Sequence, residues 1–95
     1  MESAQILKQI GLRIAELRLK KGLSREGFAG IMGMSPRYLG RLESGGQNLS
    51  VKALVRLAES LDVELVDLFA EPGIKAIPVG RPKTPTPNET TRRES

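Results

Sequence analysis

The stretch SREGFAGIMGMSPRYLGRLES, residues 24–44, has the pattern of two short helices joined by a tight turn. In its first half, Phe28 and Met32 recur at helical spacing. Ser24 stands where its side-chain oxygen can accept a hydrogen bond from a free N–H group of a first turn. We therefore expect a helix that begins at Ser24 and ends at Gly33, since glycine adopts a left-handed conformation at little cost.

A second start signal follows this turn. Ser35 can cap another helix, and Pro36 pre-sets φ at a position whose N–H needs no partner. The second helix is therefore predicted to run from Pro36 to about Glu43, with Leu39 and Leu42 on its buried face. The opposite face, which is free to contact solvent or a ligand, carries Arg37, Gly40, Arg41 and Ser44.

Small residues at Ala29 and Gly33 would let the two helices cross closely, at roughly the 90–120° of a helix-turn-helix, whose second helix enters the DNA major groove. From about Ile10 to Phe69 the sequence resembles the Cro/repressor type of helix-turn-helix, the XRE family. The resemblance implies an all-α, compact five-helix domain like that of lambda repressor, and binding to double-stranded DNA. The matching features are Leu17-Arg18, Gly22-Leu23-Ser24, Ala29, Gly33, Leu39, Leu42-Glu43, Gly45, Leu57-Ala58, Leu61 and Val63.

Three further helices are predicted outside this stretch. Residues 3–21 carry an apolar side chain every three or four positions. Ser50 can cap a fourth helix that ends at Asp62, because aspartate tolerates a left-handed cap better than most residues. A short fifth helix is expected over residues 64–70. Residues 1–71 are thus predicted to form one DNA-binding domain.

Composition narrows the class of protein. The chain has 95 residues, a net charge of +4, and neither cysteine nor histidine. It therefore lacks thiolates and the commonest metal ligand and general base, and it shows no phosphate-cradling loop. We therefore expect that the protein is not an enzyme and that it binds neither a cofactor nor a metal. The sequence shows neither an apolar run of membrane-spanning length nor the pattern of a signal peptide, so a cytoplasmic, nucleoid-associated protein is expected.

The charge is distributed unevenly along the chain. Residues 1–45 carry eight Lys or Arg against four Asp or Glu, whereas residues 46–71 carry two against five. A basic half that also carries the exposed helix face suits a polyanionic partner. The charge pattern therefore supports binding to DNA.

Arg37 and Arg41 are the candidates for reading bases, because a guanidinium group can donate two hydrogen bonds to O6 and N7 of guanine. They lie one helical turn apart and can face one groove, although either could contact only phosphate or solvent. Pro36 could offer an apolar surface to a thymine methyl group. Tyr38 could donate to a phosphate or lie along the helix interface, and Ser35 is a further candidate for DNA contact.

Phosphate contacts are predicted on both sides of this helix. Ser24 and Arg25 begin the preceding helix, whose free N–H groups form an anion site. The family usually has glutamine in place of Arg25, so an inherited contact would change from an amide to a guanidinium. After the second helix, the loop SGGQNL could place Ser44, Gln47 and Asn48 on the phosphates, although an ordinary turn explains its composition equally well.

The resemblance also implies a structural ion pair between Arg18 and Glu43. Because a core of this size is marginal alone, a homodimer is favoured. The family pairs its subunits near the C-terminal end of the domain, where Val63, Val66 and Phe69 are candidate dimer contacts. Phe69 would fit core packing about as well.

The composition changes at residue 72. Residues 72–95 carry five Lys or Arg against two Asp or Glu, with several proline and threonine residues, and are predicted to be largely disordered. Residues 74–79 could form an arm on a protein partner or a second subunit, with a loose linker as the alternative. The GRPK sequence of residues 80–83 resembles a minor-groove hook, although a plain basic tail explains it more simply.

The sequence thus predicts a sequence-specific DNA-binding transcription regulator, acting as a repressor or autoregulator on a two-fold symmetric operator as a homodimer. Two alternatives share the fold: an antitoxin, and the controller protein of a restriction–modification operon. A third alternative is a helical protein-interaction module that does not bind DNA.

Overall fold

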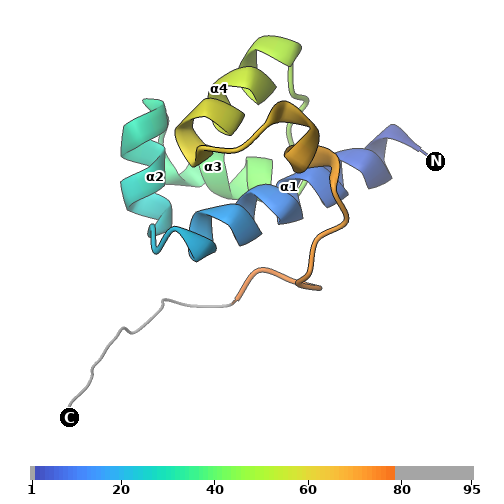
Figure 1. Cartoon of the computed structure of the whole chain (residues 1–95), viewed down its shortest axis with the longest axis horizontal. Coiled ribbons are helices and arrows are strands. Elements are labelled where there is room, and N and C mark those ends of the chain that lie inside the picture. Colours follow the sequence, from blue (N-terminus) through green and yellow to red (C-terminus); the bar gives the residue numbers. More distant parts are fainter. Residues whose placement is uncertain (1, 79–95) are drawn as a thin grey trace, which may run out of the picture.

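Four α-helices and one short 3-10 helix make up the fold (Figure 1). The computed structural model describes residues 2–78, and within that range no strand occurs, so the predicted all-α fold is confirmed. None of the described helices combines the length and apolar composition needed to cross a bilayer. In chain order the elements are α1 (Ser3–Lys20), α2 (Arg25–Met32), α3 (Pro36–Glu43), α4 (Val51–Leu61) and the 3-10 helix η1 (Leu65–Phe69).

The fifth helix differs in type from the prediction. Its residues form a five-residue 3-10 helix. The N–H of Glu64 donates to the Asp67 carboxylate at 2.9 Å, and the N–H of Asp67 donates to the carbonyl oxygen of Glu64 at 2.9 Å. In so short a segment an α-helix would leave most backbone groups without a partner, whereas bonds between residues three apart satisfy more of them.

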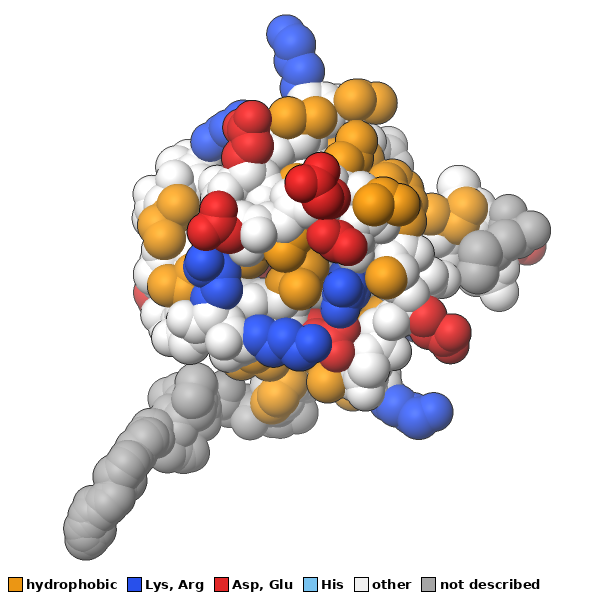
Figure 2. Space-filling model, viewed as in Figure 1, with side chains coloured by type: hydrophobic (Ala, Val, Ile, Leu, Met, Phe, Trp, Pro, Cys, Tyr) orange, Lys and Arg blue, Asp and Glu red, His pale blue; other side chains and the backbone are white. Residues whose placement is uncertain are grey.

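Together α4 and η1 leave large hydrophobic side chains exposed, and Figure 2 shows such side chains gathered over these two elements. Val66 is 71% exposed and Phe69 46%, whereas Val63 is half-buried and packs against the core. Of the three predicted dimer contacts, two therefore lie on the surface and one points inward. We call the exposed side chains of Val51, Val55, Leu65, Val66 and Phe69 the apolar patch.

Serine side chains set the starts of three helices. Ser24, Ser35 and Ser50 each stand at the N-cap, and their Oγ atoms accept a hydrogen bond from the N–H three residues later at 2.9, 3.0 and 3.0 Å. Such a cap stabilises a helix by about 1 kcal/mol relative to alanine. The predicted starts of α2, α3 and α4 are confirmed.

The turn between α2 and α3 depends on the backbone of Gly33. Its φ is +70°, in the left-handed region, as predicted. A Cβ atom added there would meet no atom within 4 Å, so Gly33 serves the turn through its φ angle and not by allowing close contact. Ala29, in contrast, is completely buried.

A close helix crossing lies at Gly11 of α1, which the sequence did not indicate. A Cβ atom added to Gly11 would lie 2.5 Å from the carbonyl oxygens of both Leu42 and Glu43. Only glycine therefore allows α1 to touch the backbone at the end of α3. This contact fixes α3 against the rest of the domain.

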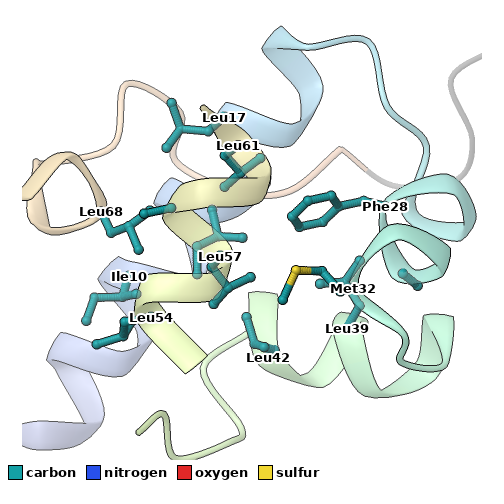
Figure 3. Close-up of a cluster of buried hydrophobic side chains, with 13 residues drawn as sticks. Ile10, Leu17, Phe28, Met32, Leu39, Leu42, Leu54, Leu57, Leu61 and Leu68 are labelled. Atoms are coloured by element: carbon teal, nitrogen blue, oxygen red, sulfur yellow. The ribbon is translucent and has the colours of Figure 1, made fainter. Parts of the chain in front are cut away.

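One hydrophobic core joins all five elements. Phe28 of α2, Leu39 of α3 and Leu57 of α4 are completely buried at its centre, and Figure 3 shows them facing one another. Burying a side chain of this size stabilises the fold by about 1.5–3 kcal/mol. The full cluster is Ile10, Ile14, Leu17, Phe28, Ala29, Met32, Leu39, Leu42, Leu54, Leu57, Ala58, Leu61 and Leu68.

The segment after η1 returns along α1 (Figure 1) and is held there by Glu16. The Gly73 N–H donates to one Glu16 oxygen at 2.9 Å, and Arg13 donates to the other at 3.0 Å. Burial acts to raise the pKa of Glu16, but these hydrogen bonds and the charge of Lys20 outweigh it, so the pKa lies below its ordinary value. Arg13 also donates to the carbonyl oxygen of Asp67 at 2.8 Å.

Replacing Glu16 with glutamine should lower the free energy of unfolding by about 1 kcal/mol at neutral pH, because a charge-assisted hydrogen bond is lost. The folded-state pKa of Glu16 is depressed, so its contribution is present above the unfolded-state pKa and is lost as the pH falls through the folded-state pKa. Urea denaturation at a series of pH values should show the difference from the wild type shrinking below about pH 4. A difference that stays constant at acid pH would contradict this role, and Glu59→Gln, at an exposed residue of α4, is the matched control.

Candidate nucleic-acid interface

The outer face of α3 presents the two arginines that the sequence singled out. Leu39 and Leu42 point into the core, whereas Arg37 and Arg41 are exposed. The buried and exposed sides of α3 are thus separated as predicted from the spacing. Both guanidinium groups can reach a ligand that approaches this face.

Other predicted contact residues lie around these arginines and differ in their exposure and in the hydrogen-bond donors that they have free. Pro36 is exposed at the first turn of α3, and Tyr38 is half-buried against the core. The oxygens of Ser24 and Ser35 accept backbone hydrogen bonds as helix caps, so each hydroxyl has only its O–H left to donate to a phosphate. Asn48 is exposed in the loop after α3.

Arg18 and Glu43 form an ion pair inside the domain. Arg18 Nε donates to Glu43 Oε2 at 2.7 Å, and Arg18 Nη2 donates to Oε1 at 3.3 Å. Glu43 is only 1% exposed and Arg18 4%. Arg18 Nη1 also donates to the carbonyl oxygen of Leu23, so the pair ties α1 to the start of α2 and the end of α3.

Arg25 belongs to the same network, a link that sequence reasoning missed. Its Nη2 atom donates to Glu43 Oε1 at 3.3 Å, and its side chain is 39% exposed. The Arg25 guanidinium lies about 3.6 Å from where a Cβ atom of Gly40 would stand, so it covers the part of α3 that lacks a side chain. One carboxylate therefore holds two guanidinium groups, which leaves a net positive charge at the junction of α2 and α3.

The loop after α3 contacts Arg41. Gln47 is half-buried, and its amide lies against the Arg41 guanidinium. Because a guanidinium only donates hydrogen bonds, we assign the amide oxygen to the side that faces it, where it accepts from Nη2 at 3.0 Å and from Nε at 3.1 Å. The structure thus joins two residues that the sequence assigned separately, one to bases and one to phosphates.

Arg56 of α4 holds the end of α2, next to the turn of the helix-turn-helix. Its Nη2 atom donates to the carbonyl oxygen of Met32, the last residue of α2, at 2.9 Å. This carbonyl is one of those that a helix end leaves without an intrahelical partner. No local pattern could reveal the contact, because the two residues are far apart in the sequence.

The segment proposed as an arm packs on its own domain as far as it is described. Ile74 and Ile77 are half-buried, and both border pockets that Leu12 of α1 also lines. Up to Pro78 the segment forms no strand. Val79 and the suggested minor-groove hook of residues 80–83 lie outside the described residues.

A helix-turn-helix that exposes arginines on its second helix is typical of DNA-binding regulators. A family model described as a helix-turn-helix (HTH_3) matches residues 14–68, which is over half of the chain. The chain belongs to this family, the XRE type of helix-turn-helix. It is a DNA-binding transcription regulator and not an enzyme.

Two relatives show the extent of the sequence similarity. An uncharacterised HTH-type transcriptional regulator from Sinorhizobium fredii, y4dJ, is 41% identical over 61 residues, which are 64% of this chain and 79% of that protein. The regulator RC0668 from Rickettsia conorii is 40% identical over 62 residues, which are 65% of this chain and 49% of that protein. The chain therefore matches about half the length of the Rickettsia relative.

Solved structures show the same fold. The restriction-modification controller protein C.AhdI from Aeromonas hydrophila is 41% identical with a TM-score of 0.62, and the match covers 66% of this chain and 96% of that one. An HTH_3 family regulator from Vibrio cholerae is 26% identical with a TM-score of 0.65, over 72% of this chain and 38% of that one. The predicted repressor-like domain is confirmed.

Replacing Arg18 with methionine should destabilise the domain by about 3 kcal/mol, because it leaves Glu43 buried with only the more distant Arg25 as a partner. Adding Glu43→Leu should recover much of this loss, since the stranded charge is then removed. Urea denaturation measures both effects. Lys21→Met is the control, because Lys21 lies in an exposed pair 3.8 Å from Asp62 and should change stability by less than about 1 kcal/mol. Equal losses for Arg18→Met and Lys21→Met would contradict the role of the buried pair.

Proposed function

We propose that this regulator binds a specific DNA sequence by inserting α3 into the major groove, with Arg37 and Arg41 reading base edges. The observation that carries the proposal is the placement of two guanidinium groups one turn apart, exposed on the second helix of the helix-turn-helix. Each can donate two parallel hydrogen bonds to O6 and N7 of guanine. Pro36 lies at the leading end of the same helix, where it can contact a thymine methyl group.

Residues around α3 supply the phosphate contacts in this proposal. Ser24 and Ser35 each retain an O–H donor at the start of a helix, Asn48 is exposed in the loop after α3, and Tyr38 of α3 carries a hydroxyl. The predicted contact at Ser44 is not included, because its hydroxyl donates to the carbonyl oxygen of Arg41 at 3.0 Å. Such contacts orient a protein on the duplex and make its affinity depend on salt. Arg25 adds positive charge from the edge of α2 while Glu43 holds it.

We further propose that the protein acts as a homodimer on a two-fold symmetric operator, as a repressor or autoregulator. The apolar patch supports this, because exposed valine and phenylalanine side chains on α4 and η1 provide a surface that a second copy can cover. Half-sites would then lie about one helical turn apart, roughly 10–10.5 bp centre to centre. Such a regulator would reside in the cytoplasm with the nucleoid.

A narrower role as the controller of a restriction–modification operon has one specific observation in its favour. The controller protein C.AhdI is 41% identical to this chain, and the match spans 96% of that protein. The antitoxin alternative gains no such support, because the apolar residues that could bind a toxin, Ile74 and Ile77, are half-buried on the same domain.

Selection of bound sequences from a random duplex pool should return a two-fold symmetric site. On that site, Arg37→Ala and Arg41→Ala should each weaken binding roughly 5- to 150-fold, with a smaller effect on unrelated duplexes. Fluorescence anisotropy at fixed salt measures both affinities. Lys21→Ala removes a cation outside the helix-turn-helix and is the control. Equal losses of affinity for the specific and unrelated duplexes would show that the arginines contact only phosphates.

Replacing Val66 with aspartate should raise the dimer dissociation constant by about tenfold or more, because a charge would be buried in an apolar interface. Sedimentation equilibrium over a range of protein concentrations measures the change. Ile31→Asp is the matched control, since Ile31 is 57% exposed on α2, outside the apolar patch. A monomer–dimer equilibrium that shifts with Ile31→Asp and not with Val66→Asp would contradict the proposed interface.

A further inference from the structure

The guanidinium of Arg41 is engaged along one edge only. With the Gln47 amide oxygen assigned to the side that faces it, the Nε and Nη2 atoms of Arg41, which form the side edge of the group, donate to Gln47 Oε1 at 3.1 and 3.0 Å. A guanidinium has five N–H donors, so the end edge formed by Nη1 and Nη2 keeps two parallel N–H groups. These two donors have the spacing that O6 and N7 of guanine accept.

The loop that carries Gln47 is anchored to the same turn of α3. The Gly46 N–H donates to the carbonyl oxygen of Arg41 at 2.8 Å, and the Ser44 hydroxyl donates to that same oxygen at 3.0 Å. The chain therefore wraps closely around the end of the helix before it reaches Gln47. The position of the Gln47 amide relative to Arg41 is set by the backbone of this turn.

Contact with α1 holds the turn in place. Gly45 has φ +86°, a left-handed conformation that favours glycine. A Cβ atom added there would lie 2.7 Å from Cα of Lys8, so the loop is packed directly against the α1 backbone. The loop cannot follow a different path without losing this contact, so the backbone places Gln47 beside Arg41.

We propose that Gln47 is a positioning residue for base recognition, which holds the side edge of Arg41 so that its end edge points toward a guanine in the major groove. The inference rests on the proposed function and adds a residue that determines specificity without touching a base. Fixing a long side chain before binding avoids the entropy that would otherwise be lost when the complex forms. Gln47 therefore raises the preference of Arg41 for guanine, and not the affinity for DNA in general.

The experiment compares the selected operator with a copy in which one guanine is replaced by 7-deazaguanine, which still pairs with cytosine but lacks the N7 acceptor. The guanine that Arg41 reads is the one whose replacement lowers the affinity of the wild type about five- to tenfold and leaves the affinity of Arg41→Ala unchanged. At that guanine, Gln47→Ala should reduce the ratio of the two affinities to about twofold. Gln47→Glu keeps an acceptor and should retain the ratio, although its charge weakens binding to both duplexes. Lys52→Ala, at an exposed residue of α4, is the control and should also retain the ratio.

The outcomes separate this inference from the proposed function. If no guanine replacement distinguishes the wild type from Arg41→Ala, Arg41 does not read guanine and the proposed function of that residue fails. If Arg41→Ala binds the two duplexes equally but Gln47→Ala keeps the wild-type ratio of affinities, the positioning role of Gln47 is overturned. A uniform loss for Gln47→Ala on both duplexes, with a shallower dependence on salt, would make Gln47 a phosphate contact and would also overturn it.

A measurement on the free protein tests the same contact without DNA. In the wild type, ¹⁵N relaxation of Arg41 Nε should report a side chain that is more rigid than that of Arg37, for which the structure shows no hydrogen-bonded partner among the described residues. Gln47→Ala should make the two arginines equally mobile, and Gln47→Glu should keep Arg41 rigid. An Arg41 side chain as mobile as Arg37 in the wild type would overturn the proposal.

Discussion

The buried carboxylate of Glu43 is the interaction on which the rest of the structure depends. It stands at the last residue of α3, accepts hydrogen bonds from Arg18 of α1 and Arg25 of α2, and is 1% exposed. A charge removed from water at this depth is stable only with well-placed partners. The three helices that form and support the helix-turn-helix are therefore held in one arrangement, with α1 touching the end of α3 through the missing side chain of Gly11.

This arrangement determines which side chains α3 exposes. Its inner side carries the buried residues Leu39, Leu42 and Glu43, and its outer side carries the exposed arginines. At one edge Arg25 lies over Gly40, and at the other Gln47 lies against Arg41. Under the proposed function, an Arg41 guanidinium held in few orientations favours selective over merely electrostatic binding.

Local signals predicted most of the fold. The serine caps, Gly33 and Asp62 marked where helices begin and end, because caps and left-handed residues act over a few bonds. The spacing of apolar residues identified the outer face of α3 and hence Arg37 and Arg41. The type of the fifth helix was not predictable, since five residues after Glu64 satisfy their backbone groups better as a 3-10 turn.

The sequence by itself determined the helices, the inner and outer faces of α3 and the family, because each follows from residues close together in the chain or from their order. Only the tertiary structure decided the partners of the charged side chains: Arg25 with Glu43, Gln47 with Arg41, Glu16 with Gly73. The contacts of Arg25 and Glu16 depend on where distant backbone segments cross, and that of Gln47 depends on the path of the loop after α3; the side chains involved are long enough to reach several alternatives. Close packing at Gly11 and Gly45 places the end of α3 and the loop after it against α1, where a Cβ atom would lie within 3 Å of backbone atoms.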